Sequence, residues 1–362
     1  MSRRSFLKGG ALAAASATLA APAMAQSQPA VQWRLQSALP RSLDTLYGAS
    51  ERLAQQVSEA TDGQFQLQPF AAGEIVGTLQ VADAVTEGTV ECGHTFSSYY
   101  VGKDPAFVFG TVLPFGLNPR QTRAWVVHGG GEALLNAFYA KYNIYSIPSG
   151  NTGVQMGGWF SKDIDTVADL EGLRFRIVGV GAEIMSRLGV IPQNIPAGDI
   201  YPSLERGTID AVEFIGPHDD ERLGLAEVAR NYYFPSWWDP GTAFSLFVNL
   251  DRWNELPSQY QSILKQCCTE VGDWMQAKYD ALNPPALRRI VASGATLKPF
   301  SREIIEASAA AAEETFADLS ASHPEFATIF EPYRAFQREQ LLWWQVAEYP
   351  YDTMMQQLRS SI

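Results

Sequence analysis

Two polar side chains stand where the sequence otherwise predicts a buried interior. Gln155 interrupts an apolar strand pattern, and Glu213 lies in the apolar run 209–215. A buried carboxylate is costly unless it is protonated, paired with a cation or solvated at a cleft. Glu213 therefore indicates one of these three environments, and the residue pattern leaves the choice among them open.

Arg176 and Asp239 occupy positions that suit the edge of a cleft. Arg176 lies near the end of the predicted strand 173–178, and open α/β sheets bind ligands at the carboxyl ends of their strands. A structural ion pair with an acid is the simpler alternative for this arginine. Asp239 follows Trp237 and Trp238 in a turn flanked by proline and glycine, which is typical of a crossover between domains.

Two short motifs that would indicate an enzyme are incomplete. Residues 128–131 read His-Gly-Gly-Gly, as in the oxyanion hole of lipases, but the sequence has no Gly-x-Ser-x-Gly elbow. We expect a break in a helical hairpin there instead. Residues 179–184 open a helix after a strand, as a dinucleotide-binding loop does, but Ile184 replaces the third glycine. That helix start could still receive a small anion.

The sequence also lacks the spacings that hold zinc or a nucleotide. It contains no His-Glu-x-x-His, no Cys-x-x-Cys and no Gly-Lys-Ser/Thr loop, and its four histidines are scattered. Zinc and nucleotide chemistry therefore find no support.

The elements that must position these residues alternate between strands and helices. This pattern predicts two α/β domains with largely parallel sheets that are covered on both faces. The expected strands are 31–35, 65–69, 90–94, 144–147, 154–160 and 173–178, and the expected helices are 44–60, 79–86 and 182–188.

The last hundred residues read as helices, and the final one is unusually aromatic. We expect helices at 258–282, 284–293, 301–319 and 326–355. The final helix could pack on its own domain, or it could dock on a second subunit. Its large apolar residues are Tyr333, Phe336, Leu341, Leu342, Trp343, Trp344, Val346 and Tyr349.

The first twenty-five residues have the form of an export signal. Residues 2–8 carry a twin arginine, an apolar run follows, and Ala23-Met24-Ala25 form a small-residue cleavage site. The run is shorter than the ~20 residues that cross a bilayer, and no cysteine for a lipid anchor stands at the cleavage point. The sequence thus predicts a folded, periplasmic protein exported by the twin-arginine route.

The net charge argues against nucleic acid as a partner, and the cysteine content argues against a disulfide framework. The formal net charge is −12, and it becomes −15 once residues 1–25, with three basic residues and no acid, are removed. Such a surface repels nucleic acid. The three cysteines are odd in number and Cys267 adjoins Cys268, so we expect buried or inert thiols rather than a disulfide framework.

Several long stretches resemble the periplasmic solute-binding subunits of tripartite ATP-independent periplasmic (TRAP) transporters, especially the 2-oxo acid binders. The resemblance implies an α/β, bilobal periplasmic-binding-protein fold: two α/β domains, a ligand cleft between them, additional C-terminal helices and no catalysis. The stretches that carry it are WRL (33–35), ADAVTEGTVEC (82–92), GNTGVQMGGWF (150–160), GDIYP (198–202) and AEY (347–349).

The resemblance also implies domain limits, with hinge crossovers near Gly150 and Gly241. It places domain I at 26–149 plus 242–283, domain II at 150–241 plus 284–330, and a dimerisation segment at 331–362 after the signal peptide 1–25.

Roles for individual residues follow from the same resemblance. Arg176 would clamp the carboxylate of the ligand. The other ligand-site residues would be Gln155, Tyr100, Tyr99, Phe214, Trp238 and Asn151. A cation would be held by Gln155, Glu213, the Phe214 carbonyl and Asp239. Members of the family have tryptophan at the position of Phe214 and glutamate at that of Asp239, so the cation position and the ligand size can differ here.

These observations predict a binder of a small 2-oxo or 2-hydroxy monocarboxylate, such as pyruvate or lactate, that serves TRAP membrane subunits. The alternatives are a sugar acid, an aromatic acid or a dicarboxylate, an exported hydrolase, and a scaffold or sensor without transport. A dicarboxylate would need a second cationic clamp, for which Arg174 is the nearest candidate. All expected cation ligands are oxygens, which favours Na⁺ or Ca²⁺ over zinc or copper.

Overall fold

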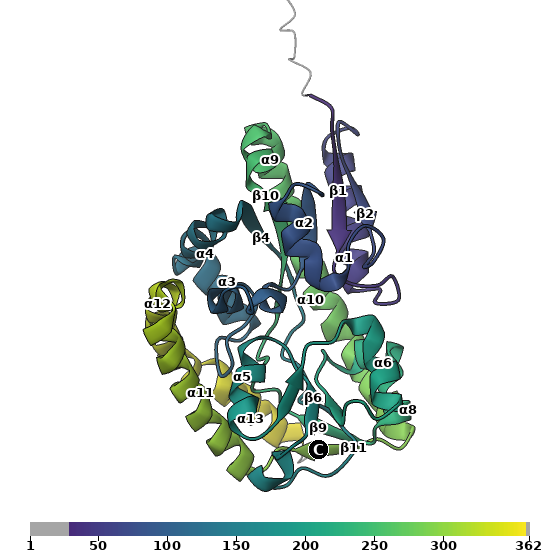
Figure 1. Cartoon of the computed structure of the whole chain (residues 1–362), viewed down its shortest axis with the longest axis vertical. Coiled ribbons are helices and arrows are strands. Elements are labelled where there is room, and N and C mark those ends of the chain that lie inside the picture. Colours follow the sequence, from purple (N-terminus) through teal and green to yellow (C-terminus); the bar gives the residue numbers. More distant parts are fainter. Residues whose placement is uncertain (1–28, 360–362) are drawn as a thin grey trace, which may run out of the picture.

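A computed structural model describes residues 29–359, which form two lobes, each built around one sheet (Figure 1). The predicted signal peptide, 1–25, lies outside the described residues. Within the part that the structure describes, no helix is long and apolar enough to cross a membrane. The three cysteines are free and buried, as predicted.

The first lobe contains a five-stranded sheet in the order β2-β1-β3-β10-β4. Its strands are β1 (Val31–Ser37), β2 (Phe65–Phe70), β3 (Cys92–Thr95), β4 (Ile144–Asn151) and β10 (Ala243–Asn249). Helix α1 (Leu46–Ala60) covers it, because Leu46, Leu53 and Val57 recur at helical spacing and are all buried.

The second lobe contains a six-stranded sheet in the order β11-β9-β5-β8-β6-β7. Its strands are β5 (Gly158–Phe160), β6 (Arg174–Arg176), β7 (Ile191–Gln193), β8 (Ala211–Val212), β9 (Asn231–Phe234) and β11 (Thr296–Pro299). The prediction of a strand over 154–160 is wrong for its first half, because residues 154–157 cross between the lobes.

Both sheets are mixed, so the prediction of largely parallel sheets is also wrong. Strand β10 runs antiparallel to β3 and β4, and β5 runs antiparallel to β8 and β9. These two strands are the ones that enter a sheet directly from the other lobe. The chain passes from β4 to β5 and returns from β9 to β10, so each entering strand runs against its neighbours.

Helix α10 (Ser258–Ala292) spans both lobes as one element. It packs on β4 and α1 of the first lobe and on α7 (Pro217–Arg222) of the second. The sequence predicts two helices here because Pro284 and Pro285 follow Asn283. An interior proline removes a backbone hydrogen bond, but packing on both lobes keeps the helix continuous.

The remaining helices are short, except for α11. Residues 129–130 separate α3 from α4, which confirms the predicted break in a helical hairpin. The α-helices are α2 (Val81–Thr86), α3 (Pro119–His128), α4 (Gly131–Tyr139), α5 (Gly179–Arg187), α6 (Ala197–Glu205), α8 (Leu225–Val228), α9 (Leu250–Glu255) and α11 (Arg302–Ser322). The 3-10 helices are η1 (Thr78–Gln80), η2 (Ser97–Tyr100), η3 (Pro105–Gly110), η4 (Ala140–Tyr142) and η5 (Val167–Leu170).

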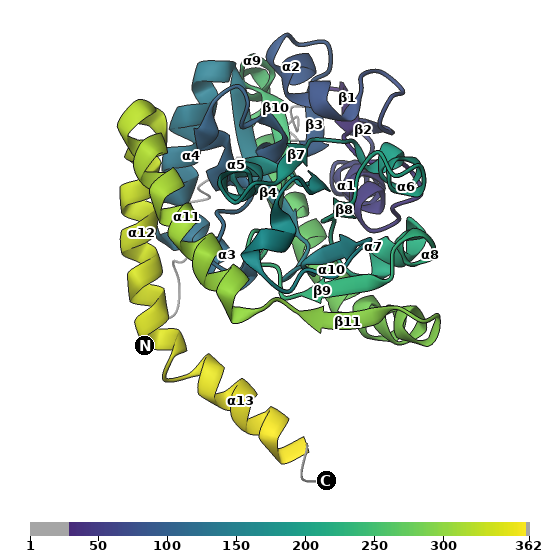
Figure 2. The same cartoon turned by 60° about the horizontal axis from the view of Figure 1, so that its bottom comes forward.

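The single final helix predicted over 326–355 is two helices, α12 (Pro324–Trp344) and α13 (Glu348–Arg359). The first half of α12 packs on the first lobe, where Phe326 and Tyr333 are buried. No residue of helix α13 is buried, and the helix extends away from the rest of the structure (Figure 2). From Leu341 onward, most large apolar side chains are exposed.

Candidate functional site

A closed cavity lies where the two lobes and both crossovers meet. Its space of about 20 Å³ holds about one water molecule, and all of its lining residues except Val178 are buried, so a small acid can enter only when the lobes move apart. The wall consists of Phe96, Ser98 and Tyr99 from the first lobe, Gln155, Asp239 and Thr242 from the crossovers, and Arg176, Val178, Glu213, Phe214 and Ile215 from the second lobe.

Arg176, the last residue of β6, is buried and held by its neighbours. Its Nη1 lies 2.5 Å from Glu213 Oε1 and 2.8 Å from the Glu213 carbonyl oxygen, and its Nε donates to the Ile195 carbonyl at 3.1 Å. The guanidinium also lies 5.7 Å from the centre of the Phe214 ring. Of the three environments open to Glu213, the structure shows pairing with a cation, and that cation is Arg176.

Two buried acids share this one arginine. Burial raises the pKa of Glu213, although the Arg176 guanidinium acts in the opposite direction. Burial likewise raises the pKa of Asp239, against the hydrogen bond from Thr242 and the charge of Arg176. When both acids are ionised, the cavity wall carries a net charge of −1. A net charge is unfavourable in a site from which water is excluded.

The amide of Gln155 is oriented by two threonines. Its Nε2 lies 3.0 Å from Thr152 Oγ1 and 2.8 Å from Thr242 Oγ1. Thr152 gives its hydroxyl proton to the Gly153 carbonyl at 3.1 Å, and Thr242 gives its own to Asp239 Oδ1 at 2.7 Å. Each hydroxyl has a single proton, so both must accept from the amide nitrogen.

This orientation leaves the Gln155 amide oxygen without a partner. Oε1 is buried and makes no hydrogen bond, although the residue lines the cavity. An unsatisfied buried acceptor costs free energy unless a ligand or an ion supplies the missing partner. The oxygens of Gln155, Glu213 and Asp239 are the kind of donors that Na⁺ and Ca²⁺ prefer. They fit a hard cation, provided that a carbonyl or the ligand completes its coordination.

The acidic residues alone do not form a metal cage. Across residues 29–359, no three histidine, cysteine, aspartate or glutamate side chains converge on one point. A cation here would therefore depend on amide and carbonyl oxygens as well.

Three of the predicted ligand residues do not line the cavity. The Tyr100 hydroxyl bonds to Thr95 at 2.7 Å in the core of the first lobe. Trp238 packs against Phe175 at 5.4 Å between ring centres. Asn151 accepts from the Gly153 N–H at 2.8 Å and supports the crossover.

Arg174 also stays outside the wall. It forms a bidentate pair with Asp210 at 2.6 and 2.9 Å and is half-exposed. It therefore supplies no second cationic clamp.

The cavity wall also contains five residues that the sequence patterns do not predict, Phe96, Ser98, Val178, Ile215 and Thr242. Thr242 lies three residues after Asp239 in the same turn, and this spacing is the signal that could have identified it. Val178 directly precedes α5, so this helix begins at the cavity, where the sequence predicts room for a small anion. A Cβ on Gly179 would lie 3.3 Å from Ser98 Cβ, so the lobes meet closely here.

Comparison with known sequences places most of this chain in one family. The model for bacterial extracellular solute-binding proteins, family 7, matches residues 37–322. A monocarboxylate 2-oxoacid-binding periplasmic protein of Nostoc sp. is 46% identical over 358 residues, which covers 97% of this chain and 98% of that protein.

Solved structures share the fold. A TRAP transporter solute-binding protein from Bordetella bronchiseptica, 45% identical, has a TM-score of 0.91 over 92% of this chain and 99% of its own; it is a mixed-occupancy dimer with calcium and picolinate. Two others have TM-scores of 0.86 and cover 89% of this chain and 98% of their own. The Colwellia psychrerythraea protein, 32% identical, has bound calcium and pyruvate. The Pseudoalteromonas atlantica protein, 34% identical, has bound sodium and pyruvate.

Proposed function

The chain belongs to the bacterial extracellular solute-binding proteins of family 7, and from this premise we propose that it captures a 2-oxo monocarboxylate such as pyruvate, together with a cation, for a TRAP transporter. The observation that carries the proposal is the wall of one closed cavity, where a buried arginine, two buried acids and an unpartnered amide oxygen meet. Lactate, the matching 2-hydroxy acid, is the second small ligand to test.

Arg176 receives the carboxylate of the ligand. Its guanidinium is fixed by Glu213 and Ile195, so it need not reorganise when an anion arrives. Nη1 and Nε already donate to Glu213 and Ile195, so Nη2 is the nitrogen that donates to the carboxylate, and the guanidinium stays charged at any relevant pH. Tyr99 and Phe96 close over the ligand from the first lobe.

Gln155, Glu213, Asp239 and the Phe214 carbonyl hold the cation, which bridges their oxygens to those of the ligand. The two acids contribute −2, Arg176 contributes +1 and a monocarboxylate contributes −1, so the loaded site carries −2 before the cation. Ca²⁺ leaves no net charge and Na⁺ leaves −1, and a residual buried charge is unfavourable. The charge count favours Ca²⁺, and both ions occur with pyruvate in similar proteins.

An aromatic 2-carboxylate is a further candidate ligand. The similar Bordetella bronchiseptica protein holds picolinate, whose ring nitrogen and carboxylate could chelate the same cation. Either ligand would be captured and released without turnover, because the cavity wall offers a clamp and a cation cage rather than a nucleophile with its base.

We also propose a homodimer formed through the C-terminal helix. Helix α13 exposes Tyr349, Tyr351, Met354 and Leu358. A groove of about 720 Å³ lies between α3, α4, β4 and α10, with Trp344 at its rim, and could receive such a helix from a second copy. This helix lies in the segment 331–362, which we predict to form the dimer. We also propose that the chain reaches the periplasm by the twin-arginine route.

Calorimetry on purified mature protein tests the function. After dialysis against chelator in sodium-free buffer, we expect pyruvate to bind only when Ca²⁺ or Na⁺ is restored, because two carboxylates otherwise face the incoming anion. Picolinate and lactate are titrated in parallel, and released product is assayed for turnover. Full affinity for the acid with neither ion present would remove the cation from the proposal.

A further inference from the structure

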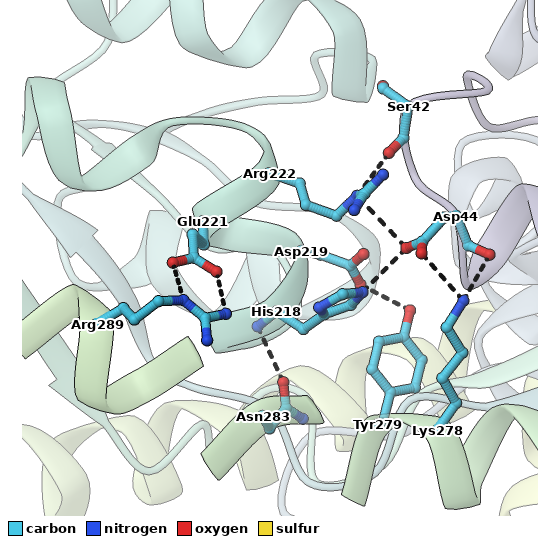
Figure 3. A network of polar contacts seen from close by, with 10 residues as sticks. All are labelled: Ser42, Asp44, His218, Asp219, Glu221, Arg222, Lys278, Tyr279, Asn283 and Arg289. Atoms are coloured by element: carbon cyan, nitrogen blue, oxygen red, sulfur yellow. Dashed lines mark hydrogen bonds and ion pairs between the residues drawn. The ribbon is translucent and has the colours of Figure 1, made fainter. Parts of the chain in front are cut away.

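A second polar cluster joins the lobes away from the ligand cavity (Figure 3). Its centre is Asp44, which lies just before α1 in the first lobe. His218 and Arg222 reach it from α7 of the second lobe, and Lys278 reaches it from α10, the helix that spans both. Three cationic or polar groups therefore meet on one carboxylate.

The contacts use both the side chain and the backbone of the first lobe. Asp44 Oδ1 lies 2.9 Å from His218 Nε2 and 3.4 Å from Arg222 Nε, and Asp44 Oδ2 lies 3.1 Å from Lys278 Nζ. Arg222 Nε also donates to the Ser42 carbonyl at 2.8 Å, and Lys278 Nζ donates to the Asp44 carbonyl at 2.9 Å. The segment 42–44 is thus held at several points.

Helix α7 is anchored firmly to the second lobe, so these contacts join lobe to lobe. Asp220 accepts from Trp159 Nε1 at 2.9 Å and from the Tyr232 hydroxyl at 2.6 Å, and both partners lie in the second sheet. Asp219 accepts from the Tyr279 hydroxyl of α10 at 2.6 Å. His218 and Arg222 cannot follow Asp44 if the lobes separate.

The cluster also lies where α10 changes lobes. Lys278 is on the part of the helix before the proline pair, and the Asn283 side chain accepts from the His218 N–H at 3.0 Å. A bend of α10 near Pro284 would separate His218 and Arg222 from Asp44, whereas Lys278 lies before the bend. Entry of a ligand requires the lobes to separate, since the cavity has room for about one water molecule.

We propose that Asp44, with His218, Arg222 and Lys278, forms a latch that stabilises the closed arrangement of the lobes and thereby slows release of the bound acid. The proposal rests on the proposed function for its ligand, but the closing motion can be measured without one. Such a latch stabilises the closed state whether or not a ligand is present. The apparent affinity then follows the fraction of molecules able to close.

The Asp44→Asn variant tests the latch, because the amide keeps the size of the side chain and removes its charge. We expect the dissociation rate of pyruvate in the presence of Ca²⁺ to rise about tenfold by stopped-flow fluorescence, equivalent to ~1.4 kcal/mol. Lys278→Met should act in the same direction, and the double variant should lose less than the sum of the two single variants, because both changes remove the same ion pair between Asp44 and Lys278.

Glu221→Gln is the matched control. Glu221 pairs with Arg289 of α10 at 2.6 Å, but both residues stay within the second lobe. It should leave the dissociation rate unchanged. An equal rise in the dissociation rate in Glu221→Gln would show general support of α7 and would overturn the latch. An unchanged rate in Asp44→Asn would also overturn the latch.

A measurement of the distance between the lobes distinguishes failure of the latch from failure of the proposed function. Spin labels on Gln55→Cys in α1 and Glu205→Cys in α6 report it, because both positions are exposed and the native cysteines are buried. In ligand-free protein, Asp44→Asn should shift the distance distribution to longer values. Identical distributions would overturn the latch, whereas a wild-type protein that closes but binds no acid would overturn only the ligand assignment.

Discussion

The Thr242 hydroxyl gives its only proton to Asp239 Oδ1 at 2.7 Å, and this fixes the direction in which Thr242 can bond to its other neighbour. It can only accept from the Gln155 amide, which turns the glutamine oxygen away from both threonines. A residue that need not touch the ligand therefore determines which end of Gln155 is offered to it.

Removing the Thr242 hydroxyl should weaken cation and acid binding together. Thr242→Val keeps the shape but deprives Asp239 of a donor and Gln155 of an acceptor. We expect about a tenfold loss, ~1–1.5 kcal/mol, by calorimetry with Ca²⁺ and pyruvate. Thr242→Ser, which keeps the hydroxyl, should recover most of the affinity.

Thr315→Val is the control for this change. The Thr315 hydroxyl is also buried, but it bonds to the Ala311 carbonyl within α11. If Thr315→Val loses as much affinity as Thr242→Val, the effect is one of general stability and the orienting role is wrong.

Replacement of Arg176 should nearly abolish binding even when the charge is kept. Arg176→Lys offers a point charge where a planar group bonds to Glu213, Ile195 and the incoming carboxylate. We expect at least about a thirtyfold loss, ~2 kcal/mol. Arg176→Ala would leave the Glu213 carboxylate buried without its cation, so the lysine variant is the cleaner test.

Arg174→Lys is the matched control, because Arg174 forms a bidentate pair with Asp210 outside the cavity. It should change affinity little. Wild-type affinity in Arg176→Lys would contradict the clamp.

The order of elements could be predicted from local patterns, whereas pairing between lobes could not. Buried residues at helical spacing predict α1, and alternation predicts β2, because a half-buried element repeats its burial at short range. The antiparallel entry of β5 and β10 depends on strands far apart in sequence. Helix α10 continues through Pro284 and Pro285 because it packs on both lobes.

The candidate site shows the same division. Residue type alone identifies Glu213 and Arg176 as candidate site residues, because one is an acid in an apolar run and the other is a cation at the end of a strand. Tyr99 and Tyr100 are adjacent and chemically alike, yet only Tyr99 lines the cavity, since η2 turns its neighbour into the core. Nothing in the local sequence distinguishes the two.

The buried Asp220 should make stability depend on pH. Burial raises its pKa from 3.8 to about 6, although Tyr232 and Trp159 donate hydrogen bonds to it. The folded state therefore holds this proton more tightly than the unfolded chain. Stability from this group is fully present below about pH 4 and is lost as pH rises through 6.

Asp220→Asn isolates this effect. We expect the difference in unfolding free energy between wild type and variant to fall by on the order of 2 kcal/mol from pH 4 to pH 7, measured by urea denaturation without ligand. A difference that stays constant across this range would show that Asp220 titrates as it does in the unfolded chain.

Removing α13 should produce a monomer without disturbing the lobes. A truncation after Pro332 is unsuitable, because it also removes Tyr333, whose hydroxyl accepts from the Leu117 N–H at 2.8 Å in the core. Truncation after Ala347 removes helix α13, none of whose residues is buried. Light scattering at micromolar concentration should then give a dimer for the full mature chain and a monomer for the truncated one, with unchanged thermal unfolding of the lobes at low concentration. The exposed apolar side chains of α13 have no partner role if the full chain is monomeric. If the truncated chain still dimerises, another surface forms the interface.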